Sequence, residues 1–199
     1  MATEMPRLVL ATRNAGKVAE LAARLDGLGV ALVSAADVPG APDVDETADS
    51  LAGNAALKAV ALHAHTGLPA LADDTGLFVA ALGGAPGVHS ARYAGPEADD
   101  GANRARLLDA LRGETDRSAQ FETVLALATD AGVRFFSGVC RGRILPEERG
   151  AGGFGYDRLF VPDDGDGRTF AEMTRDEKGR ISHRARALDA FAEAIRDGL

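Results

Sequence analysis

The sequence predicts an α/β fold organised around a mixed β-sheet. In the first third of the chain, strand-like and helical segments alternate, a pattern that favours parallel strands. Further along, two long segments of alternating hydrophobicity, residues 119–128 and 133–144, are separated only by Asp130-Ala131-Gly132. This spacing is typical of an antiparallel hairpin. The two kinds of connection together indicate a sheet with both parallel and antiparallel strands.

Helical periodicity and breaker residues define the elements expected in the first half. Apolar residues recur at helical spacing from 17 to 28, after a short buried strand and a polar turn. A second, alanine-rich helix ends at Gly67, with Pro69 just beyond it. We expect, in order, a strand at 7–11, a helix at 17–28, a strand at 31–34, a loop at 35–50 and a helix at 51–67.

The second half contains more breaks. Residues 70–79 are predicted to be a strand pair interrupted at 73–76, with loops at 83–87 and 150–155. The spacings Thr169-x-x-Glu172 and Thr174-x-x-Glu177 match the capping box that begins a helix. Further helices are expected at 103–111 and at about 182–196. Because no repeat or long linker divides the chain, residues 1–199 are predicted to form a single domain.

Composition excludes several classes of protein. No apolar run approaches the roughly 20 residues of a membrane-spanning helix, so we expect no membrane partner. The first residues lack the features of a signal peptide, and the single cysteine, Cys140, excludes an internal disulfide; a cytoplasmic protein is expected. A net charge of −8 argues against nucleic-acid binding. A metal ion and a few basic groups are still able to hold a small polyanion.

The first polar cluster follows the first strand and consists of Thr12, Arg13, Asn14, Ala15, Gly16 and Lys17. A turn from strand to helix presents backbone N–H groups and the positive end of the helix dipole, which suits phosphate. The alternative is an ordinary helix cap formed by Asn14, with Lys17 in solvent. The segment is not a P-loop, because Ala11 and Val18 occupy the positions of the glycine and the hydroxyl residue of that motif.

Two further clusters carry carboxylates. Asp73 and Asp74 lie within a buried-looking segment, where adjacent carboxylates are costly unless they meet a cation, and oxygen ligands beside phosphate favour Mg²⁺. In an extended chain their side chains point in opposite directions, so one can face a metal while the other braces the loop. Asn54 and Lys58 share one helix face, and Glu46 is a candidate second ligand. The alternatives are an aspartate-rich turn and a solvated acidic loop.

The fourth cluster lies in the last third of the chain. Glycines around Phe154 and Tyr156 let backbone and ring approach a flat ligand closely. His183 and Arg184, at the start of the last helix, are candidates to contact a base edge or a phosphate. The alternative is that both aromatic residues belong to the core and that Ser182 is only a helix cap.

In this order, the clusters resemble the inosine triphosphate pyrophosphatase family (the Ham1/RdgB-like purine nucleoside triphosphate pyrophosphatases). The resemblance covers nearly the whole chain. The matching segments are Thr12-x-Asn14-x-x-Lys17, Glu46-Thr47, Asn54-Ala55-x-x-Lys58-Ala59, 72–77, 82–87, 90–93, 152–157, and Glu177-Lys178-x-x-x-Ser182-His183-Arg184.

The resemblance implies an elongated α/β fold with two lobes and a cleft between them, as a homodimer that cleaves purine nucleoside triphosphates such as ITP, dITP and XTP to the monophosphate and pyrophosphate. Asp74 is implied as metal ligand and general base, Glu46 as second metal ligand, and Mg²⁺ as cofactor. Lys17 and Lys58 are expected to stabilise the departing pyrophosphate. The implied substrate-binding residues are 12–17, Asn54, Thr75, Phe154, Gly155, Tyr156, Asp157, Lys178, His183 and Arg184.

Gly53 departs from the family pattern, which usually has an acid before Asn54. If that acid assists the metal or the water, this chain relies on Glu46, Asp73 and Asp74 instead. Two rival hypotheses remain at this level. A Maf-like nucleotide pyrophosphatase is disfavoured because its N-terminal signature is rich in serine and arginine. A non-catalytic nucleotide-binding protein is disfavoured because binding alone does not require paired carboxylates.

Overall fold

A computed structural model describes residues 6–12, 15–27 and 29–197 of the chain. It divides the chain into two compact units, each built from separate stretches of sequence. Unit 1 comprises Met1–Asp74, Thr123–Gly138 and Arg186–Leu199, and unit 2 comprises Thr75–Glu122 and Val139–Ala185. Arg13 and Asn14, both predicted to bind substrate, lie outside the described residues.

Unit 1 begins with a β-α-β arrangement. Strand β1 (Arg7–Leu10) is followed by helix α1 (Ala15–Leu25) and strand β2 (Ala31–Ser34). β1 pairs in parallel with β2 and also with β3 (Ala70–Val79), in the register Leu10↔Leu71. The parallel pairing predicted for this part of the chain is therefore confirmed.

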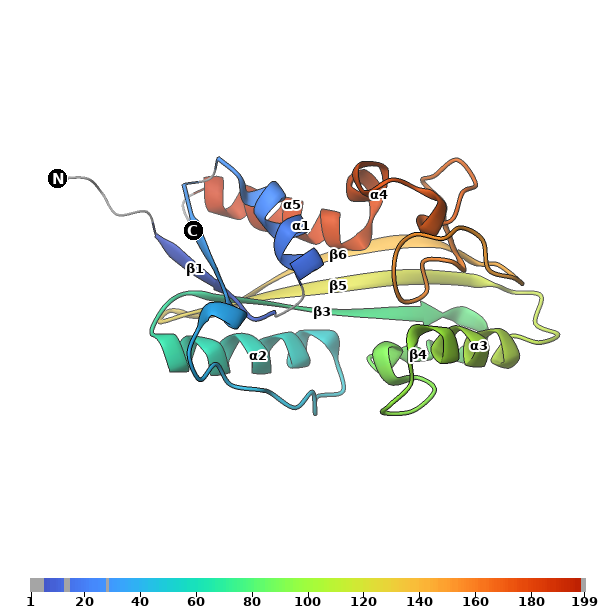
Figure 1. Cartoon of the computed structure of the whole chain (residues 1–199), viewed down its shortest axis with the longest axis horizontal. Helices are drawn as coiled ribbons and strands as arrows, with labels where there is room; N and C mark the ends of the chain where they lie inside the picture. Colours follow the sequence, from blue (N-terminus) through green and yellow to red (C-terminus); the bar gives the residue numbers. More distant parts are fainter. Residues whose placement is uncertain (1–5, 13–14, 28, 198–199) are drawn as a thin grey trace. The chain divides into compact units, whose positions relative to one another are not determined.

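Side-chain size alternates along the strands of unit 1 and separates two packing faces. Leucines of β1, β3 and β5 (Ser118–Thr129) pack with α1 and α5 (His183–Arg196). The intervening alanines Ala72, Ala126 and Ala128 pack with Ala55 and Ala59 of α2 (Leu51–Thr66). Because neighbouring side chains in a strand point to opposite faces, this alternation places α2 on one face and α1 with α5 on the other (Figure 1).

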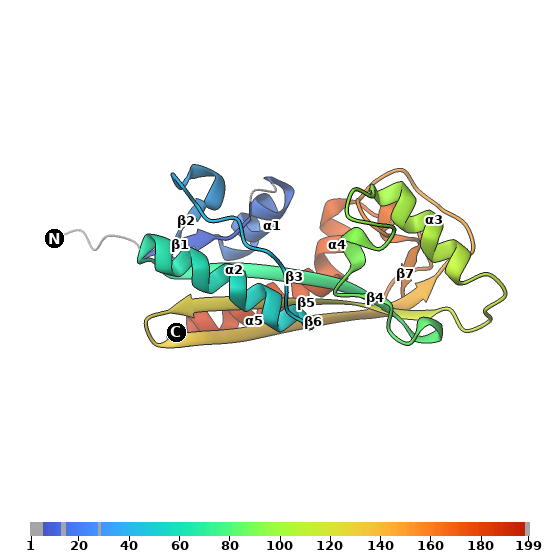
Figure 2. The same cartoon turned by 90° about the horizontal axis from the view of Figure 1, so that it is seen from below.

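Unit 2 has its own core of aliphatic and aromatic side chains. Helix α3 (Asp100–Ala110) contributes Leu107, and β7 (Phe160–Pro162) contributes Phe160. Phe170 comes from the 3-10 turn Phe170–Glu172, which precedes α4 (Arg175–Ile181). Figure 2 shows α3, β4 (Pro86–Gly87) and β7 within this unit. The other short 3-10 turns are Ala35–Asp37, Ala80–Leu82 and Ser90–Arg92.

The described strands form one seven-stranded sheet in the order β2-β1-β3-β5-β6-β7, with β4 paired to β3. β5 and β6 (Gly132–Ile144) are neighbours joined by a two-residue turn, which only an antiparallel pair can accommodate. β3–β4 and β6–β7 are antiparallel as well. The predicted α/β fold with a mixed sheet is confirmed.

Several predicted boundaries were wrong. Residues 70–79 form one continuous strand rather than an interrupted pair, because lysine side chains meet the carboxylates of Asp73 and Asp74 and the strand continues past them. Pro86–Gly87 pairs with β3 although a loop was expected there, and β7 was not predicted. Helix α3 begins at Asp100 rather than at 103, because Asp99 accepts a hydrogen bond from Ala102 and caps the helix.

Local capping signals were more dependable. Both predicted capping boxes are present, at Thr169–Glu172 and at Thr174–Glu177. Ser182 ends α4, and its hydroxyl accepts a hydrogen bond from Ala185 N in the first turn of α5. These signals succeeded because a cap depends on residues only three or four positions apart.

No helix in the described part of the chain has the length and apolar character needed to cross a membrane.

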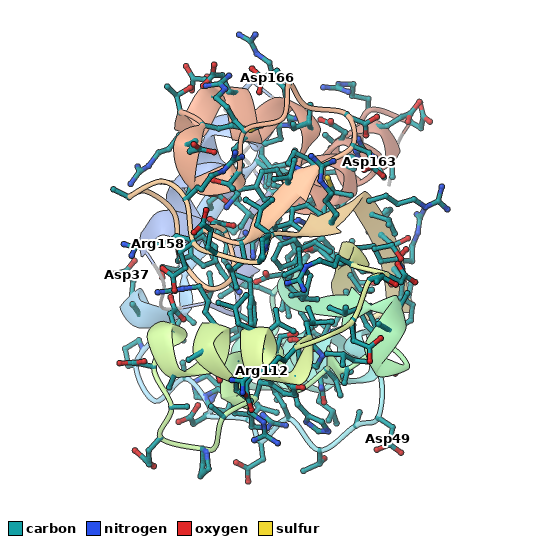
Figure 3. All side chains as sticks on the ribbon, turned by 90° about the vertical axis from the view of Figure 1, so that its right-hand side faces the viewer. Asp37, Asp49, Arg112, Arg158, Asp163 and Asp166 are labelled. Carbon is teal, nitrogen blue, oxygen red and sulfur yellow. The ribbon has the colours of Figure 1, made fainter. Side chains whose placement is uncertain are left out.

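Acidic side chains are spread over the surface of the described residues. Asp37, Asp49, Asp163 and Asp166 are exposed, and Figure 3 shows them projecting outward.

Candidate active site

Parallel pairing of β1 with β3 brings two distant polar segments together in unit 1. Leu10 is the partner of Leu71, and Ala11 N donates to Leu71 O at 2.8 Å, so Thr12 lies beside the part of β3 that carries Asp73. Lys17, in the first turns of α1, reaches the same carboxylate at 2.9 and 3.1 Å. Thr12 and Lys17, two of the residues predicted to bind phosphate, are therefore next to the predicted carboxylate pair.

The ammonium group of Lys58, on α2, contacts groups from two other segments, the loop that carries Glu46 and strand β3. It donates to Glu46 Oε1 at 2.7 Å and to the carbonyl of Asp73 at 2.8 Å, and it lies 3.4 Å from Asp74 Oδ1. Burial lowers the pKa of Lys58, but the attraction of Asp74, Glu46 and Asp73 outweighs it and raises the pKa overall. Lys58 therefore remains a cation at neutral pH.

Asp74 differs from the other carboxylates of this cluster in how its two oxygens are bonded. Its side chain is buried, and among the described residues Oδ2 has no hydrogen-bond partner. Burial raises the pKa of Asp74, and the nearby charge of Glu46 adds to this, while Lys58 and a weaker interaction with Asn54 act in the opposite direction. Asp73 differs, because both of its oxygens accept hydrogen bonds from Lys17. The two carboxylates therefore meet different lysines, as side chains that point in opposite directions from a strand do, and that one of them faces a metal stays a prediction.

A pocket of about 300 Å³ opens in unit 1 beside this cluster. Thr12 and Lys58 both line it, so the first loop and the carboxylate-bound lysine share one cavity. The complete lining is Ala11, Thr12, Ala35, Pro42, Asp43, Val44, Lys58 and Leu62.

The donor set fits a hard divalent cation that is shared with a ligand. Glu46 and Asp74 both contact Lys58, and Asp74 has a buried oxygen without a hydrogen-bond partner among the described residues. No group of three or more His, Cys, Asp or Glu side chains gathers as a complete metal cage in the part of the chain that is described. One or two carboxylates, with phosphate oxygens and water completing the shell, is the usual environment of Mg²⁺.

The glycine-rich segment of unit 2 forms a second cluster. Asp157 Oδ2 accepts hydrogen bonds from Lys178 Nζ at 2.6 Å and from Phe154 N at 3.0 Å. Gly153 has a φ of +72°, and a Cβ there would lie against the Asp157 carboxylate, so only glycine fits. The Lys178 ammonium lies 4.7 Å from the centroid of the Phe154 ring, which is 51% exposed. A half-exposed ring beside a fixed cation is suited to a flat, polar ligand.

The neighbouring residues separate into those that face this cluster and those that belong to the core. Arg184 lies 5.9 Å from the Phe154 ring, and its Nη2 is 3.4 Å from Thr75 Oγ1. His183 is buried and stacked on Phe121 at 4.6 Å. Tyr156 is also buried; burial raises its pKa, and its hydroxyl donates to Ser90 O at 2.8 Å. Tyr156 therefore fits the alternative hypothesis of a core aromatic, whereas Phe154 does not.

Comparison with known proteins decides the family. The sequence profile of the Ham1 family matches residues 8–194. The chain belongs to the Ham1 family. It is 50% identical to the dITP/XTP pyrophosphatase of Geobacter sulfurreducens over 187 residues, 92% of this chain and 94% of that protein. It is also 50% identical to the dITP/XTP pyrophosphatase of Syntrophobacter fumaroxidans, over 91% of this chain and 78% of that protein.

Solved structures agree with this assignment. The structure of a HAM1 protein from Coxiella burnetii superposes with a TM-score of 0.92 at 40% identity, covering 98% of this chain and 100% of that one. The α/β fold expected from the family resemblance is thereby confirmed.

Gly53, the departure from the Ham1 pattern, has a local structural reason. Its N–H is capped by Ser50 Oγ at 3.1 Å. A Cβ at position 53 would lie 2.6 Å from Ala48 Cβ, so any side chain requires the preceding loop to shift. In this Ham1 chain the carboxylates near Lys58 come from Glu46, Asp73 and Asp74 instead.

The structure thus groups the predicted residues of this Ham1 chain into two sets. Unit 1 brings together Thr12, Lys17, Glu46, Asn54, Lys58, Asp73 and Asp74, and unit 2 brings together Thr75, Phe154, Gly155, Asp157, Lys178 and Arg184. Asp100 and Arg104 were missed, although both contact Gly155. No sequence signal identifies them, because an acid and an arginine four residues apart are common on exposed helices.

Proposed function

We propose that this chain hydrolyses non-standard purine nucleoside triphosphates, such as ITP, dITP and XTP, to the nucleoside monophosphate and pyrophosphate with the assistance of Mg²⁺. The observation that carries the proposal is the arrangement around Lys58 in unit 1. There, one ammonium group joins Glu46 and Asp74, and the latter keeps a buried oxygen without a hydrogen-bond partner among the described residues. The similarity to the dITP/XTP pyrophosphatases of Geobacter sulfurreducens and Syntrophobacter fumaroxidans supports the same reaction.

Glu46 and Asp74 are the proposed ligands of Mg²⁺. A cation bound there would neutralise charge that develops on the phosphates as the bond between the α- and β-phosphates breaks. Side chains of this protein are proposed to activate the attacking water. Asp74 accepts a proton from the attacking water at Oδ2, and its raised pKa suits that task. The water oxygen bonds to the α-phosphorus, and pyrophosphate leaves with the electron pair of the broken P–O bond.

Lys58 and Lys17 provide positive charge to the phosphates. Lys58 lines the same pocket as Thr12, which stands at the end of β1. Lys17 pairs with Asp73 at 2.9 Å, and its side chain is only partly buried, so its positive charge is proposed to act on the phosphates from the first turn of α1. The N-terminal end of α1, which begins at Ala15, adds the positive end of the helix dipole.

Recognition of the base is assigned to unit 2. Lys178 and Arg184, both close to the Phe154 ring, carry only hydrogen-bond donors. The 6-oxo group of hypoxanthine or xanthine accepts from such donors, whereas the 6-amino group of adenine faces them with another donor. With ATP, the donors of the site would lose their hydrogen-bond partner, so kcat/KM for ATP is expected to be lower than kcat/KM for ITP.

The direct test is release of pyrophosphate from ITP, XTP, dITP, GTP, ATP and dUTP, with and without Mg²⁺. We expect the highest kcat/KM with ITP, dITP or XTP and no turnover after chelation of the metal. Binding of ITP without release of pyrophosphate would instead identify a nucleotide-binding protein. Preference for dUTP or ATP would contradict the assignment of the base.

Asp74→Asn tests the residue that carries the mechanism. We expect kcat on ITP to fall by about 10³-fold or more, because an amide does not accept the proton. Asp73→Asn is the matched control, since that carboxylate is engaged by Lys17, and a smaller loss is expected. Turnover of Asp74→Asn close to that of the unmodified chain would remove Asp74 from this role.

A homodimer and a cytoplasmic location complete the proposal. Support comes from the family resemblance and from the lone, buried Cys140, which suits a reducing compartment. Size-exclusion chromatography with light scattering tests the assembly: a single species of twice the 20.6 kDa chain mass is expected, and a monomer at all concentrations would contradict it.

A further inference from the structure

One residue of the glycine-rich segment, Gly155, is held through both of its backbone polar groups by helix α3. The N–H of Gly155 donates to Asp100 Oδ2 at 2.6 Å, and its carbonyl accepts from Arg104 Nη1 at 2.8 Å. Asp100 and Arg104 are four residues apart on α3 and therefore share one face of the helix. A single helix thus satisfies both hydrogen-bonding groups of Gly155.

The arginine of this pair is itself fixed. Arg104 is only 9% exposed, and its Nε donates to Glu148 Oε1 at 2.8 Å. The hydrogen bond from Arg104 is the main cause of a lowered pKa at Glu148, and Arg158, labelled in Figure 3, adds to it. Glu148 is therefore ionised at neutral pH. A buried guanidinium with two of its edges engaged cannot swing away from Gly155 without leaving a buried charge unpaired.

The residue immediately before Gly155 is the half-exposed Phe154. Its own N–H donates to Asp157 Oδ2 at 3.0 Å, the oxygen that also accepts from Lys178. The backbone is thus fixed on the N-terminal side of Phe154 by Asp157 and on the C-terminal side by α3. Gly155 adopts a φ of +59°. Because glycine populates positive and negative φ values about equally, this backbone conformation is defined by the contacts that surround it.

We infer that Asp100 and Arg104 are positioning residues that hold the Phe154 ring in place for stacking on the purine base before the substrate arrives. The inference rests on the proposed function, because it assigns Phe154 to the base. Neither residue reaches the reacting phosphates in this role. Their contribution is to remove the cost of ordering the loop during binding, which appears in KM rather than in kcat.

Kinetics on ITP test the inference against a merely structural role. Asp100→Ala removes the acceptor for Gly155 N–H, and we expect KM to rise by about 5- to 10-fold with kcat changed less than about 2-fold. Asp100→Asn keeps an acceptor oxygen and should restore KM to near the value of the unmodified chain. Arg104→Lys loses the fork that spans Gly155 and Glu148, so KM should rise as it does for Asp100→Ala.

Asp99→Ala is the matched control. Asp99 is the neighbouring acid on the same helix, and it caps α3 through Ala102 N at 2.7 Å without contacting Gly155. We expect it to lower the melting temperature while leaving KM unchanged. If Asp99→Ala and Asp100→Ala raise KM equally, the contacts serve only to stabilise α3 and the inference is wrong.

A second readout needs no catalysis. Because the chain contains no tryptophan, Phe154→Trp introduces a single fluorophore at the ring in question. Adding Asp100→Ala to this variant should lower its fluorescence anisotropy, whereas adding Asp100→Asn should not. Unchanged anisotropy would overturn the inference. Absence of turnover in the unmodified chain, with the anisotropy change present, would instead overturn the proposed function and leave the positioning of Phe154 intact.

Discussion

Two lysine–carboxylate contacts, one in each unit, differ in how completely their oxygens are used. In unit 1, Lys58 is shared between Glu46 and Asp74, and Asp74 keeps a buried oxygen without a hydrogen-bond partner among the described residues. In unit 2, a single oxygen of Asp157 accepts from both Lys178 and Phe154 N, and the ammonium also faces the rings of Phe154 and Phe170.

The difference separates chemistry from recognition. A buried carboxylate oxygen without a donor is costly in the free protein and becomes favourable when a cation or a proton arrives, so unit 1 has the features of a reactive site. A carboxylate that is already satisfied holds its lysine in one position. Unit 2 therefore has the features of a surface that orients a flat ligand.

Among the lysine substitutions, removal of Lys58 should have the largest effect on turnover. We expect Lys58→Met to lower kcat on ITP by about 10²- to 10³-fold, because a charged group that faces the phosphates is lost. The variant also leaves Glu46 and Asp74 without their shared cation, so the apparent affinity for Mg²⁺ should change as well. Steady-state kinetics across a Mg²⁺ titration measure both effects. A kcat within a factor of about two of the unmodified chain would show that Lys58 is only structural.

Removal of Lys178 should affect binding more than turnover. We expect Lys178→Met to raise KM for ITP by about 10-fold with a smaller change in kcat, since a group that orients the base stabilises the bound substrate and the transition state alike. Phe154→Leu should show the same pattern. If Lys178→Met instead lowers kcat as strongly as Lys58→Met does, the division between reactive and recognising units fails.

Lys17→Ala should have an intermediate effect. The ammonium of Lys17 pairs with Asp73, and the Lys17 side chain is 25% exposed, so loss of the pair should cost about 1 kcal/mol and lower the melting temperature by about 2–4 °C. KM for ITP should rise several-fold through weaker binding of the triphosphate. Collapse of the melting temperature with unchanged KM would support the alternative, in which this turn only caps the helix.

The smallest expected effect is on the pH dependence of stability and comes from Glu177, which lies next to Lys178. Arg168 is the main cause that lowers its pKa from 4.5 to about 2. A depressed pKa means that the stabilisation is complete above the unfolded value of 4.5 and is lost as the pH falls toward 2. Glu177→Gln should therefore be less stable than the unmodified chain at pH 6, with the difference shrinking below pH 4.5. Urea midpoints at pH 6, 4 and 3 measure it, and a constant difference would exclude this linkage.

Local signals in the sequence determined much of the fold. The capping boxes at Thr174 and Thr169, the leucine and alanine alternation of the strands, and the glycine after α2 each depend on residues close together in the chain. The same holds for the adjacent carboxylates Asp73 and Asp74, whose opposite directions follow from strand geometry.

Only the tertiary structure decided which side chains meet. The continuity of β3 depends on Lys17 and Lys58, which lie 56 and 15–16 residues away in sequence. Tyr156 is buried in the core and Phe154 is half-exposed, although both flank Gly155. Asp100 and Arg104 contact that glycine only because α3 packs beside it. Contacts of this kind depend on how elements pack, and no short-range pattern encodes the packing.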